Sequence, residues 1–170
     1  VYGSIDALLA CSEPTPCLLA AYLADPEVQA MDPGERRLYL RSVMLSLVLA
    51  GLDSTGSGLF FCLDLLARHA QSQRLVRDEV HTVFGDGEIS PTDLPRQLPY
   101  TLAAVQEALR LYPPVWFLGR EAVITTTVMG HPIAPGDIVL TSPYVIHRHP
   151  GHWNEPDQFR PDRDGTDRAH

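Results

Sequence analysis

Basic residues are scarce in this sequence of 170 residues. Lysine and arginine together number 13, aspartate and glutamate number 21, and the formal net charge at pH 7 is −8. A protein that binds nucleic acid needs a basic surface that neutralises phosphates, and no run of basic residues offers one. The charge balance therefore excludes a nucleic-acid partner.

Cysteine is also rare. The three cysteines, Cys11, Cys17 and Cys62, make an odd number, and none belongs to a CxxC pair. Domains that depend on a disulfide framework carry an even and denser set of cysteines. We therefore expect reduced thiols and a cytoplasmic protein. A bridge between Cys11 and Cys17 stays open as an alternative.

The sequence also shows neither the pattern of a leader peptide nor that of a membrane-spanning helix. The first residues, VYGSIDALLA, lack the basic region that opens a secretory signal peptide. Residues 43–66 are long enough for a membrane helix, but Asp53 and Asp64 interrupt them. We expect a buried helix of a soluble domain there, and no membrane segment. Because the chain lacks an initial methionine and ends on the polar run DRDGTDRAH, we expect both of its ends to be cut.

Helical patterns dominate what is present. Hydrophobic residues make up 45% of the chain and charged residues 20%, as in an ordinary globular domain. Asp32 and Pro33 form a typical helix start, and the pattern predicts a helix from about residue 33 to 69. At about 1.5 Å per residue this helix is roughly 50 Å long. Two shorter helices are predicted after it, over residues 71–84 and 99–112.

The helical pattern gives way to β-branched residues after the third helix. The stretch EAVITTTVMGHPIAPGDIVLTS, residues 121–142, is rich in valine, isoleucine and threonine and is broken by MGH and APGD. This pattern is typical of short paired strands that tight turns connect. The predicted fold class is therefore mainly α with a small β region.

Polar residues interrupt the most apolar part of the long helix. In LVLAGLDSTGSGLFF, residues 47–61, Asp53 and Ser54 stand between glycines. An interior helical glycine costs roughly 1 kcal/mol relative to alanine, and a carboxylate in an apolar setting is costly without a partner. The pattern indicates either a functional site or a buried helix that its hydroxyl side chains bend, with Asp53 paired to a basic residue.

A second set of candidates consists of charged residues. Glu107 and Arg110 are three positions apart, so they share a helix face and can form an ion pair. Most pairs of this kind are solvated surface contacts that contribute little to stability. Two further arginines follow, Arg120 in PPVWFLGR and Arg163 in FRPDR.

Three histidines, His147, His149 and His152, crowd into HRHPGH. A zinc site is the metal-binding interpretation of this cluster. The cluster lacks the helical i,i+4 pair of a metalloprotease, and Pro150 breaks it. We therefore expect no metal ligand among these residues.

The order of these segments resembles the cytochrome P450 family of haem-thiolate monooxygenases. AGLDST, residues 50–55, is similar to the oxygen-activation motif of that family, and EALR, residues 107–110, matches its ExxR motif. PPVWFLGR, residues 113–120, resembles the segment that ends in a haem-propionate arginine. SPYVIHRHPGHWNEPDQFRPDR, residues 142–163, resembles the region that leads to the arginine joining the Glu-Arg pair. Four motifs in the right order, over about residues 31–163, make the resemblance specific.

The resemblance implies a P450-like fold, with haem against the middle of the long helix. Ala50 and Gly51 would leave a groove for dioxygen. Asp53 would connect to solvent and Ser54 would hold a proton or an ordered water, so that the two relay protons to dioxygen. The family usually has threonine where this chain has Ser54. Because serine lacks the methyl group that restricts the rotamer, we expect retained activity with poorer coupling of reductant to product.

The charged residues take different roles under the same resemblance. Arg120 would bind a haem propionate through a charge-assisted contact. Glu107, Arg110 and Arg163 would form a structural charge network near the proximal side of the haem. Loss of one member of this network should unfold the haem pocket and leave the chemistry of the site unaltered.

The iron ligand is the largest departure from the family. A haem-thiolate enzyme needs a cysteine thiolate on iron, and in the family this cysteine lies in a FxxGxRxCxG loop shortly after the arginine that Arg163 matches. The chain reaches His170 before any such loop, and Cys62 has the wrong surroundings. We therefore expect residues 1–170 to be a partial cytochrome P450-like domain that lacks the N-terminal part and the cysteine loop and is inactive alone.

As part of a longer chain, the resemblance implies haem-dependent monooxygenation of an unidentified small organic substrate. Dioxygen would be the cosubstrate, and a ferredoxin or a flavoprotein reductase would supply electrons. One alternative is a degenerate, non-catalytic helical module that binds a partner and keeps Glu107, Arg110 and Arg163 for folding. The other is an unrelated α+β enzyme that uses Asp53 and the histidine cluster.

Overall fold

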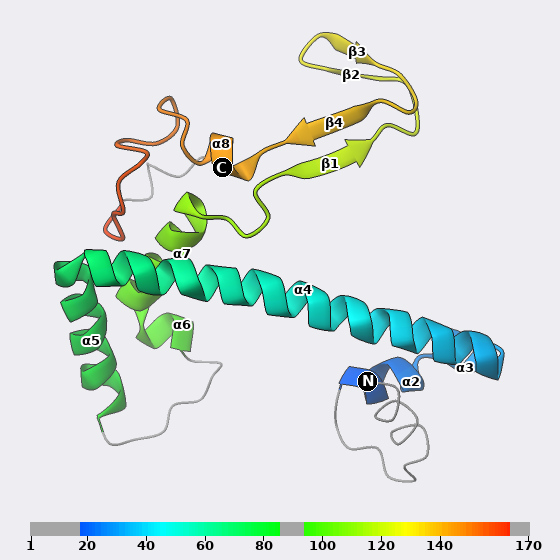
Figure 1. The fold of residues 1–170 in the computed structure, drawn as a ribbon, viewed down its shortest axis with the longest axis horizontal. Coiled ribbons are helices and arrows are strands. Elements are labelled where there is room, and N and C mark those ends of the chain that lie inside the picture. Colours follow the sequence, from blue (N-terminus) through cyan, green and yellow to red (C-terminus); the bar gives the residue numbers. More distant parts are fainter. Residues whose placement is uncertain (1–17, 86–93, 164–170) are drawn as a thin grey trace. The chain divides into compact units, whose positions relative to one another are not determined.

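The computed structural model describes residues 18–85 and 94–163, which form a mainly helical fold with short antiparallel strands (Figure 1). This confirms the predicted fold class. The chain divides into two units, with the boundary between residues 53 and 54. Cys11 and Cys17 lie outside the described residues, so the alternative of a bridge between them stays a prediction.

The first unit packs two short helices against the start of a long one. α2 (Leu18–Ala24) and α3 (Pro26–Ala30) lead into α4 (Pro33–Arg68). Val28 and Leu40 are the buried core, with 3% and 0% of their surface exposed. Three partly buried side chains pack against this pair: Tyr22, Leu23 and Met44.

The start of α4 follows from its local sequence. The Asp32 carboxylate accepts the backbone N–H of Gly34 at 2.8 Å, and Pro33 occupies the first helical position. Both features satisfy or remove donors that the first turn of a helix leaves unpaired. The predicted helix over residues 33–69 is confirmed to within one residue.

The second unit begins within α4 and continues through three more helices before its strands. α5 (Ala70–Phe84) ends at Gly85, whose φ of 47° lies in the left-handed region that glycine tolerates best. A single turn, α6 (Leu94–Gln97), precedes α7 (Pro99–Leu111). The predicted second and third helices are confirmed to within one residue. The sequence analysis did not predict α6, because its four residues lie in a stretch rich in turn formers.

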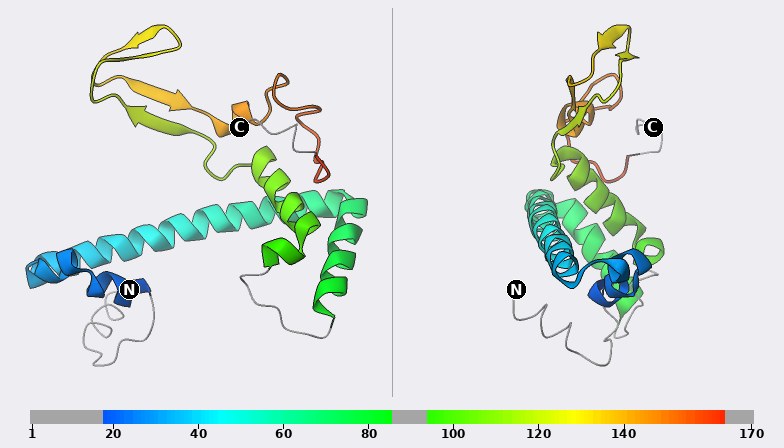
Figure 2. Two further views of the ribbon diagram at one scale, coloured as in Figure 1. Left: turned by 180° about the vertical axis from the view of Figure 1, so that it is seen from behind. Right: turned by 90° about the vertical axis from the view of Figure 1, so that its right-hand side faces the viewer.

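Two antiparallel pairs of strands follow α7 (Figure 2). β1 (Leu118–Glu121) pairs with β4 (Ile138–Thr141), and β2 (Thr126–Val128) pairs with β3 (His131–Ile133) between them. This confirms the predicted paired strands over residues 121–142. β1 starts three residues earlier than predicted, because its register with β4 extends to Leu118.

One helical turn and a long coil complete the second unit. α8 (Pro143–Ile146) starts at Ser142, whose hydroxyl accepts the N–H of Val145 at 3.4 Å and donates to the carbonyl of Trp116 at 2.8 Å. The coil after α8 runs to Arg163 and supplies most of the acceptors of the site described below.

The core of the second unit lies where α7 and the coil pack against the end of α4. Its buried side chains come from all three segments and are Cys62, Leu65, Ala104, Ala108, Leu111 and Phe159. Gly58 lets α4 and α7 approach closely, because a Cβ at this position would lie 3.2 Å from Leu109 Cδ2. The two helices therefore lie in close contact at this point.

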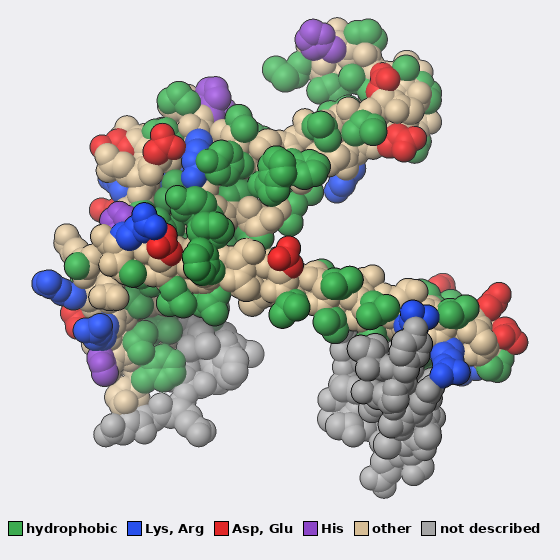
Figure 3. All heavy atoms as spheres, viewed as in Figure 1, with side chains coloured by type: hydrophobic (Ala, Val, Ile, Leu, Met, Phe, Trp, Pro, Cys, Tyr) green, Lys and Arg blue, Asp and Glu red, His purple; other side chains and the backbone are tan. Residues whose placement is uncertain are grey.

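The middle of α4 is exposed, and the prediction of a buried helix is wrong for the described residues. Figure 3 shows hydrophobic side chains at the surface along α4. Those with more than 40% of their surface exposed are Leu47, Val48, Leu49, Leu52, Leu59, Phe60 and Leu63. In the second unit the buried residues of α4 are Cys62 and Leu65, which lie toward the end of the helix and pack against α7 and the coil. By length and composition α4 is the one described helix that could cross a membrane. Central helices of soluble proteins have the same length and composition, so these two properties do not place α4 in a membrane.

The contact at Gly58 gives a stability prediction. We expect Gly58→Val to lower the free energy of unfolding by about 1–3 kcal/mol relative to Gly56→Val, because only the side chain at position 58 would collide with Leu109. Gly56 is the matched control, since no atom lies within 4 Å of a Cβ placed there. Urea unfolding of the two variants measures the difference, and equal values would contradict the close packing.

Candidate functional site

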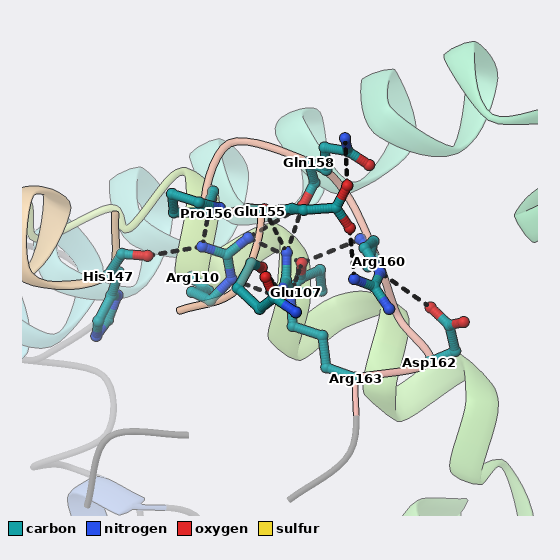
Figure 4. A network of polar contacts seen from close by, with 10 residues as sticks. Glu107, Arg110, His147, Glu155, Pro156, Gln158, Arg160, Asp162 and Arg163 are labelled. Carbon is teal, nitrogen blue, oxygen red and sulfur yellow. Dashed lines mark hydrogen bonds and ion pairs between the residues drawn. The ribbon is translucent and has the colours of Figure 1, made fainter. Parts of the chain in front are cut away.

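The Glu107 carboxylate lies at the centre of a buried polar network (Figure 4). Its Oε2 accepts Arg110 Nε at 2.8 Å, and its Oε1 accepts Arg110 Nη2 at 2.8 Å. Oε1 also accepts Arg163 Nε at 2.8 Å and the backbone N–H of Arg160 at 3.0 Å. The structure thus brings together Glu107, Arg110 and Arg163, the three residues proposed from sequence as a charge network.

Arg110 joins α7 to the coil that follows α8. Nη1 donates to the carbonyls of His147 and Pro156 at 2.6 and 2.7 Å, and Nη2 donates to that of Gln158 at 3.1 Å. With the two bonds to Glu107, all five N–H donors of the guanidinium have acceptors. The indole of Trp153 covers the guanidinium, with the ring centroid 4.8 Å from Cζ. Because a lysine has neither this fork nor this number of donors, an arginine is required at position 110.

Arg163, at the end of the coil, binds the same Glu107 carboxylate. Besides Glu107, it donates to the backbone carbonyls of Asn154, Glu155 and Gln158. These acceptors lie five to nine residues before Arg163 in the chain. One carboxylate and two guanidiniums therefore hold the coil in a single conformation.

Burial makes this network costly to form and costly to break. Glu107 and Arg110 each expose 5% of their surface. Burial alone would raise the pKa of Glu107. The hydrogen bonds from Arg110, Arg163 and the Arg160 N–H, together with the charge of Arg110, outweigh burial and lower the pKa. The carboxylate is therefore ionised at neutral pH, and two cations face one anion and a set of carbonyl dipoles.

An open cavity of about 430 Å³ lies on another side of α7. Its lining is mostly apolar and comes from α4, α7 and the proline segment after α7. The lining residues are Ser54, Thr55, Gly58, Leu59, Cys62, Val105, Leu109 and Pro114. The two hydroxyl side chains, Ser54 and Thr55, stand at consecutive positions of α4 and are the polar members of this lining.

The predicted site residues of α4 differ in their exposure to solvent. Ser54 is half-buried and lines the cavity. Ala50, Gly51 and Asp53 are exposed and belong to the first unit. Asp53 is therefore not in the apolar environment that the sequence analysis expected, since its side chain is exposed among the described residues.

Arg120 lies apart from the charge network. It is exposed on β1, and its Nη1 donates to the carbonyl of Gly119 at 3.0 Å. The histidines of HRHPGH also serve local contacts: His149 Nδ1 accepts the N–H of Gly151 at 3.0 Å, and the rings of His147 and Trp153 lie 6.1 Å apart. Among residues 18–85 and 94–163, no three side chains of the metal-binding types form a cluster.

Sequence reasoning missed the carbonyl acceptors and Trp153. Every residue has a backbone carbonyl, so the sequence does not indicate which carbonyls accept hydrogen bonds. The acceptors at residues 147, 156 and 158 could therefore not be predicted. Trp153 offers a signal, since a lone tryptophan in a polar coil is unusual and calls for a partner. Its partner is the Arg110 guanidinium.

Breaking the network should destabilise the fold. We expect Glu107→Ala to cost about 3–5 kcal/mol of unfolding free energy, because it leaves two buried guanidiniums without their shared anion. Arg160→Ala is the control, since its ion pair with Glu155 is partly exposed and should contribute about 0–1 kcal/mol. Urea unfolding compares the two, and a Glu107→Ala loss no larger than the control's would contradict the account.

The lowered pKa values predict how stability depends on pH. Burial and the charges of Arg110 and Arg148 lower the pKa of His147 below its ordinary value of 6.5. Protonation of His147 therefore favours the unfolded chain, and its contribution to stability is lost as the pH falls below about 6.5 through the lowered folded pKa. For Glu107 the same sign applies, with the loss beginning below about pH 4.3.

Unfolding free energy measured from pH 7.5 to 3.5 should therefore fall in two stages. We expect His147→Gln to remove the earlier stage, whereas His131→Gln, at an exposed position on β3, should retain it. Identical pH profiles for the two variants would show that His147 does not cause the earlier stage.

Comparisons with known proteins show the family to which this chain belongs. The cytochrome P450 family model matches residues 23–164. Cyclooctatin synthase of Streptomyces melanosporofaciens is 40% identical over 126 residues, which cover 74% of this chain and 27% of that protein. Human cytochrome P450 4A11 is 38% identical over 125 residues, covering 73% of this chain and 24% of that protein.

A solved structure of a zebrafish cytochrome P450 with progesterone is similar to this chain with a TM-score of 0.66 and 29% identity. The similarity covers 69% of this chain and 28% of the zebrafish protein. The chain thus spans about a quarter of the length of the relatives that it matches. With the family model matching most of its residues, the chain belongs to the cytochrome P450 family.

Proposed function

We propose that the whole protein is a haem-dependent monooxygenase, of which residues 1–170 form a partial P450-like domain. It would insert oxygen from dioxygen into a small organic substrate, with electrons from a ferredoxin or a flavoprotein reductase. The observation that carries the proposal is the cavity beside α7, because Ser54 supplies a hydroxyl to its lining while another face of α7 carries the charge network.

Membership of the family implies haem as the cofactor, and the described residues fit part of this requirement. The mostly apolar lining of the cavity suits the face of a macrocycle. Cys62 is among the cavity residues, but it does not suit the iron, because it is buried beside Leu65 and Ala104 and burial raises the pKa of its thiol. A thiolate ligand is therefore absent from the described residues.

Bound haem would activate dioxygen. The residues of this chain would supply protons and an apolar surface beside the haem. Asp53 and Ser54 are neighbours on α4, with side chains about 100° apart around the helix. Asp53 is exposed and can exchange protons with water, whereas Ser54 lines the cavity. We assign Ser54 Oγ the role of donating a proton into the cavity and the Asp53 carboxylate the role of replacing it from solvent.

The remaining site residues take roles that follow from their size and charge. Ala50 and Gly51 lie one turn before Ser54, where small side chains would leave room for dioxygen against the helix. Arg120 is exposed on β1, and its charge would suit a haem propionate. Glu107, Arg110 and Arg163 would act by holding the coil in place, because their donors and acceptors are used within the network.

Incorporation of ¹⁸O from ¹⁸O₂ tests the proposed function. The protein is expressed from its complete gene, purified with haem, supplied with a ferredoxin and its reductase, and given a panel of apolar compounds that includes progesterone, which occurs in the zebrafish structure. We expect haem at one per chain and one ¹⁸O atom in a product. A protein that takes up no haem would contradict the proposal and favour the degenerate, non-catalytic module.

Substitutions at Ser54 test the proton role separately. We expect Ser54→Ala to lower the product formed per electron pair consumed by about 10-fold or more, because the donor hydroxyl is lost. Ser54→Thr keeps the hydroxyl and adds the methyl group that restricts the rotamer, so it should match or exceed the starting protein. Product and peroxide measured against consumed reductant give the coupling. Equal coupling in the alanine and threonine variants would show that the hydroxyl carries no proton.

A further inference from the structure

Glu79, in the middle of α5, contacts the first turn of α7 from another helix. Its Oε1 accepts the backbone N–H of Tyr100 at 2.8 Å. Its Oε2 accepts the backbone N–H of Thr101 at 2.7 Å and the Thr101 hydroxyl at 2.6 Å. One carboxylate thus makes three hydrogen bonds to two consecutive residues that lie more than 20 positions later in the chain.

These bonds satisfy the backbone N–H groups that remain unpaired in the first turn of α7. The first helical residue, Pro99, has no N–H, and Leu102 already donates to the carbonyl of Leu98 at 2.9 Å. Leu98, at the N-cap position, makes no side-chain bond to the helix. The N–H groups of Tyr100 and Thr101 are left, and Glu79 accepts both. The carboxylate also faces the positive end of the helix dipole.

The ionisation of Glu79 agrees with this geometry. Its partial burial would raise the pKa, but the Thr101 hydroxyl and the two backbone N–H groups lower it below the ordinary glutamate value. Glu79 is therefore a carboxylate at neutral pH, as a contact to a helix N-terminus requires.

The core contacts of α7 with α4 and α5 are apolar. Ala104 and Ala108 are buried against Cys62 and Leu65 of α4, and Val76 of α5 packs on the same cluster. Burial of apolar surface is non-directional, and small side chains such as alanine offer little resistance to sliding or rotation. Hydrogen bonds are directional, so the three bonds to Glu79 fix both the rotation of α7 and its position along its axis.

A shift or rotation of α7 at its start would displace the site residues further along the same helix. A slip by one residue moves a helix by about 1.5 Å and turns it by about 100°. Glu107 and Arg110, which carry the charge network, and Leu109, which lines the cavity, lie two to three turns further along the same helix. Their placement therefore depends on the start of α7.

We propose that Glu79 is a positioning residue for the site: as a cap supplied by another helix, it fixes α7 so that the Glu107–Arg110 pair and the cavity wall face their partners. Its consequence for haem binding rests on the proposed function, whereas the capping contact itself does not.

The test uses the haem-loaded protein expressed from its complete gene and compares Glu79→Ala with two controls. Val76→Ala removes apolar packing from α5 without touching the cap, and so lowers stability by another route. Asp78→Asn removes a carboxylate from the neighbouring, exposed position. The readouts are hydrogen exchange of the Tyr100 and Thr101 amides, and the rate of haem loss to excess apomyoglobin at a temperature where every variant is folded.

We expect Glu79→Ala to speed exchange at both amides by about fivefold or more, the effect of losing a helix cap. Haem loss should accelerate by a similar factor. Glu79→Gln keeps one acceptor oxygen and should lie between Glu79→Ala and the starting protein. Val76→Ala and Asp78→Asn should leave the rate of haem loss within twofold.

Two results would overturn the proposal. Unchanged exchange at Tyr100 and Thr101 in Glu79→Ala would show that Glu79 is not the cap. Faster exchange with haem loss no greater than in Val76→Ala would show that the cap has only a general structural role. A starting protein that binds no haem would instead contradict the proposed function, and amide exchange would still decide whether Glu79 caps α7.

Discussion

One buried carboxylate organises the second unit of this chain. Glu107 neutralises two guanidiniums that it also orients, and through them it fixes the backbone of residues 147–163. A coil of this length without regular structure has high conformational entropy, which scattered surface contacts would not overcome. Charge-assisted hydrogen bonds in a buried setting are strong and directional enough to select one conformation.

α7 links the charge network of Glu107 to the cavity, because it contributes residues to both. One side of the helix carries Glu107 and Arg110, and another side carries Val105 and Leu109, which line the cavity. A rigid helix joins the two, so the network and the cavity wall are placed together. The placement of the cavity wall therefore depends on residues that do not line the cavity, and Glu79 extends that set to the start of the helix.

The sequence predicts features whose causes are local. Helix ends were predictable because Asp32 and Gly85 act on neighbouring backbone groups, and the Glu107–Arg110 pair follows from helical spacing. Arg163 needed the family resemblance, since 56 positions separate it from its partner. The start of β1 depends on pairing with a distant strand, and the exposure of Asp53 depends on which elements cover α4, so local patterns could not give either.

The central claim is that Glu107 organises the framework on which, as we propose, the whole protein binds haem with the thiolate ligand that its family implies. X-ray absorption at the iron edge of the protein expressed from its complete gene tests this claim most directly. The account predicts one sulfur atom among the iron ligands of the purified protein, and loss of that sulfur signal when Glu107 is replaced by alanine. Iron with only nitrogen and oxygen ligands in the unaltered protein would contradict it.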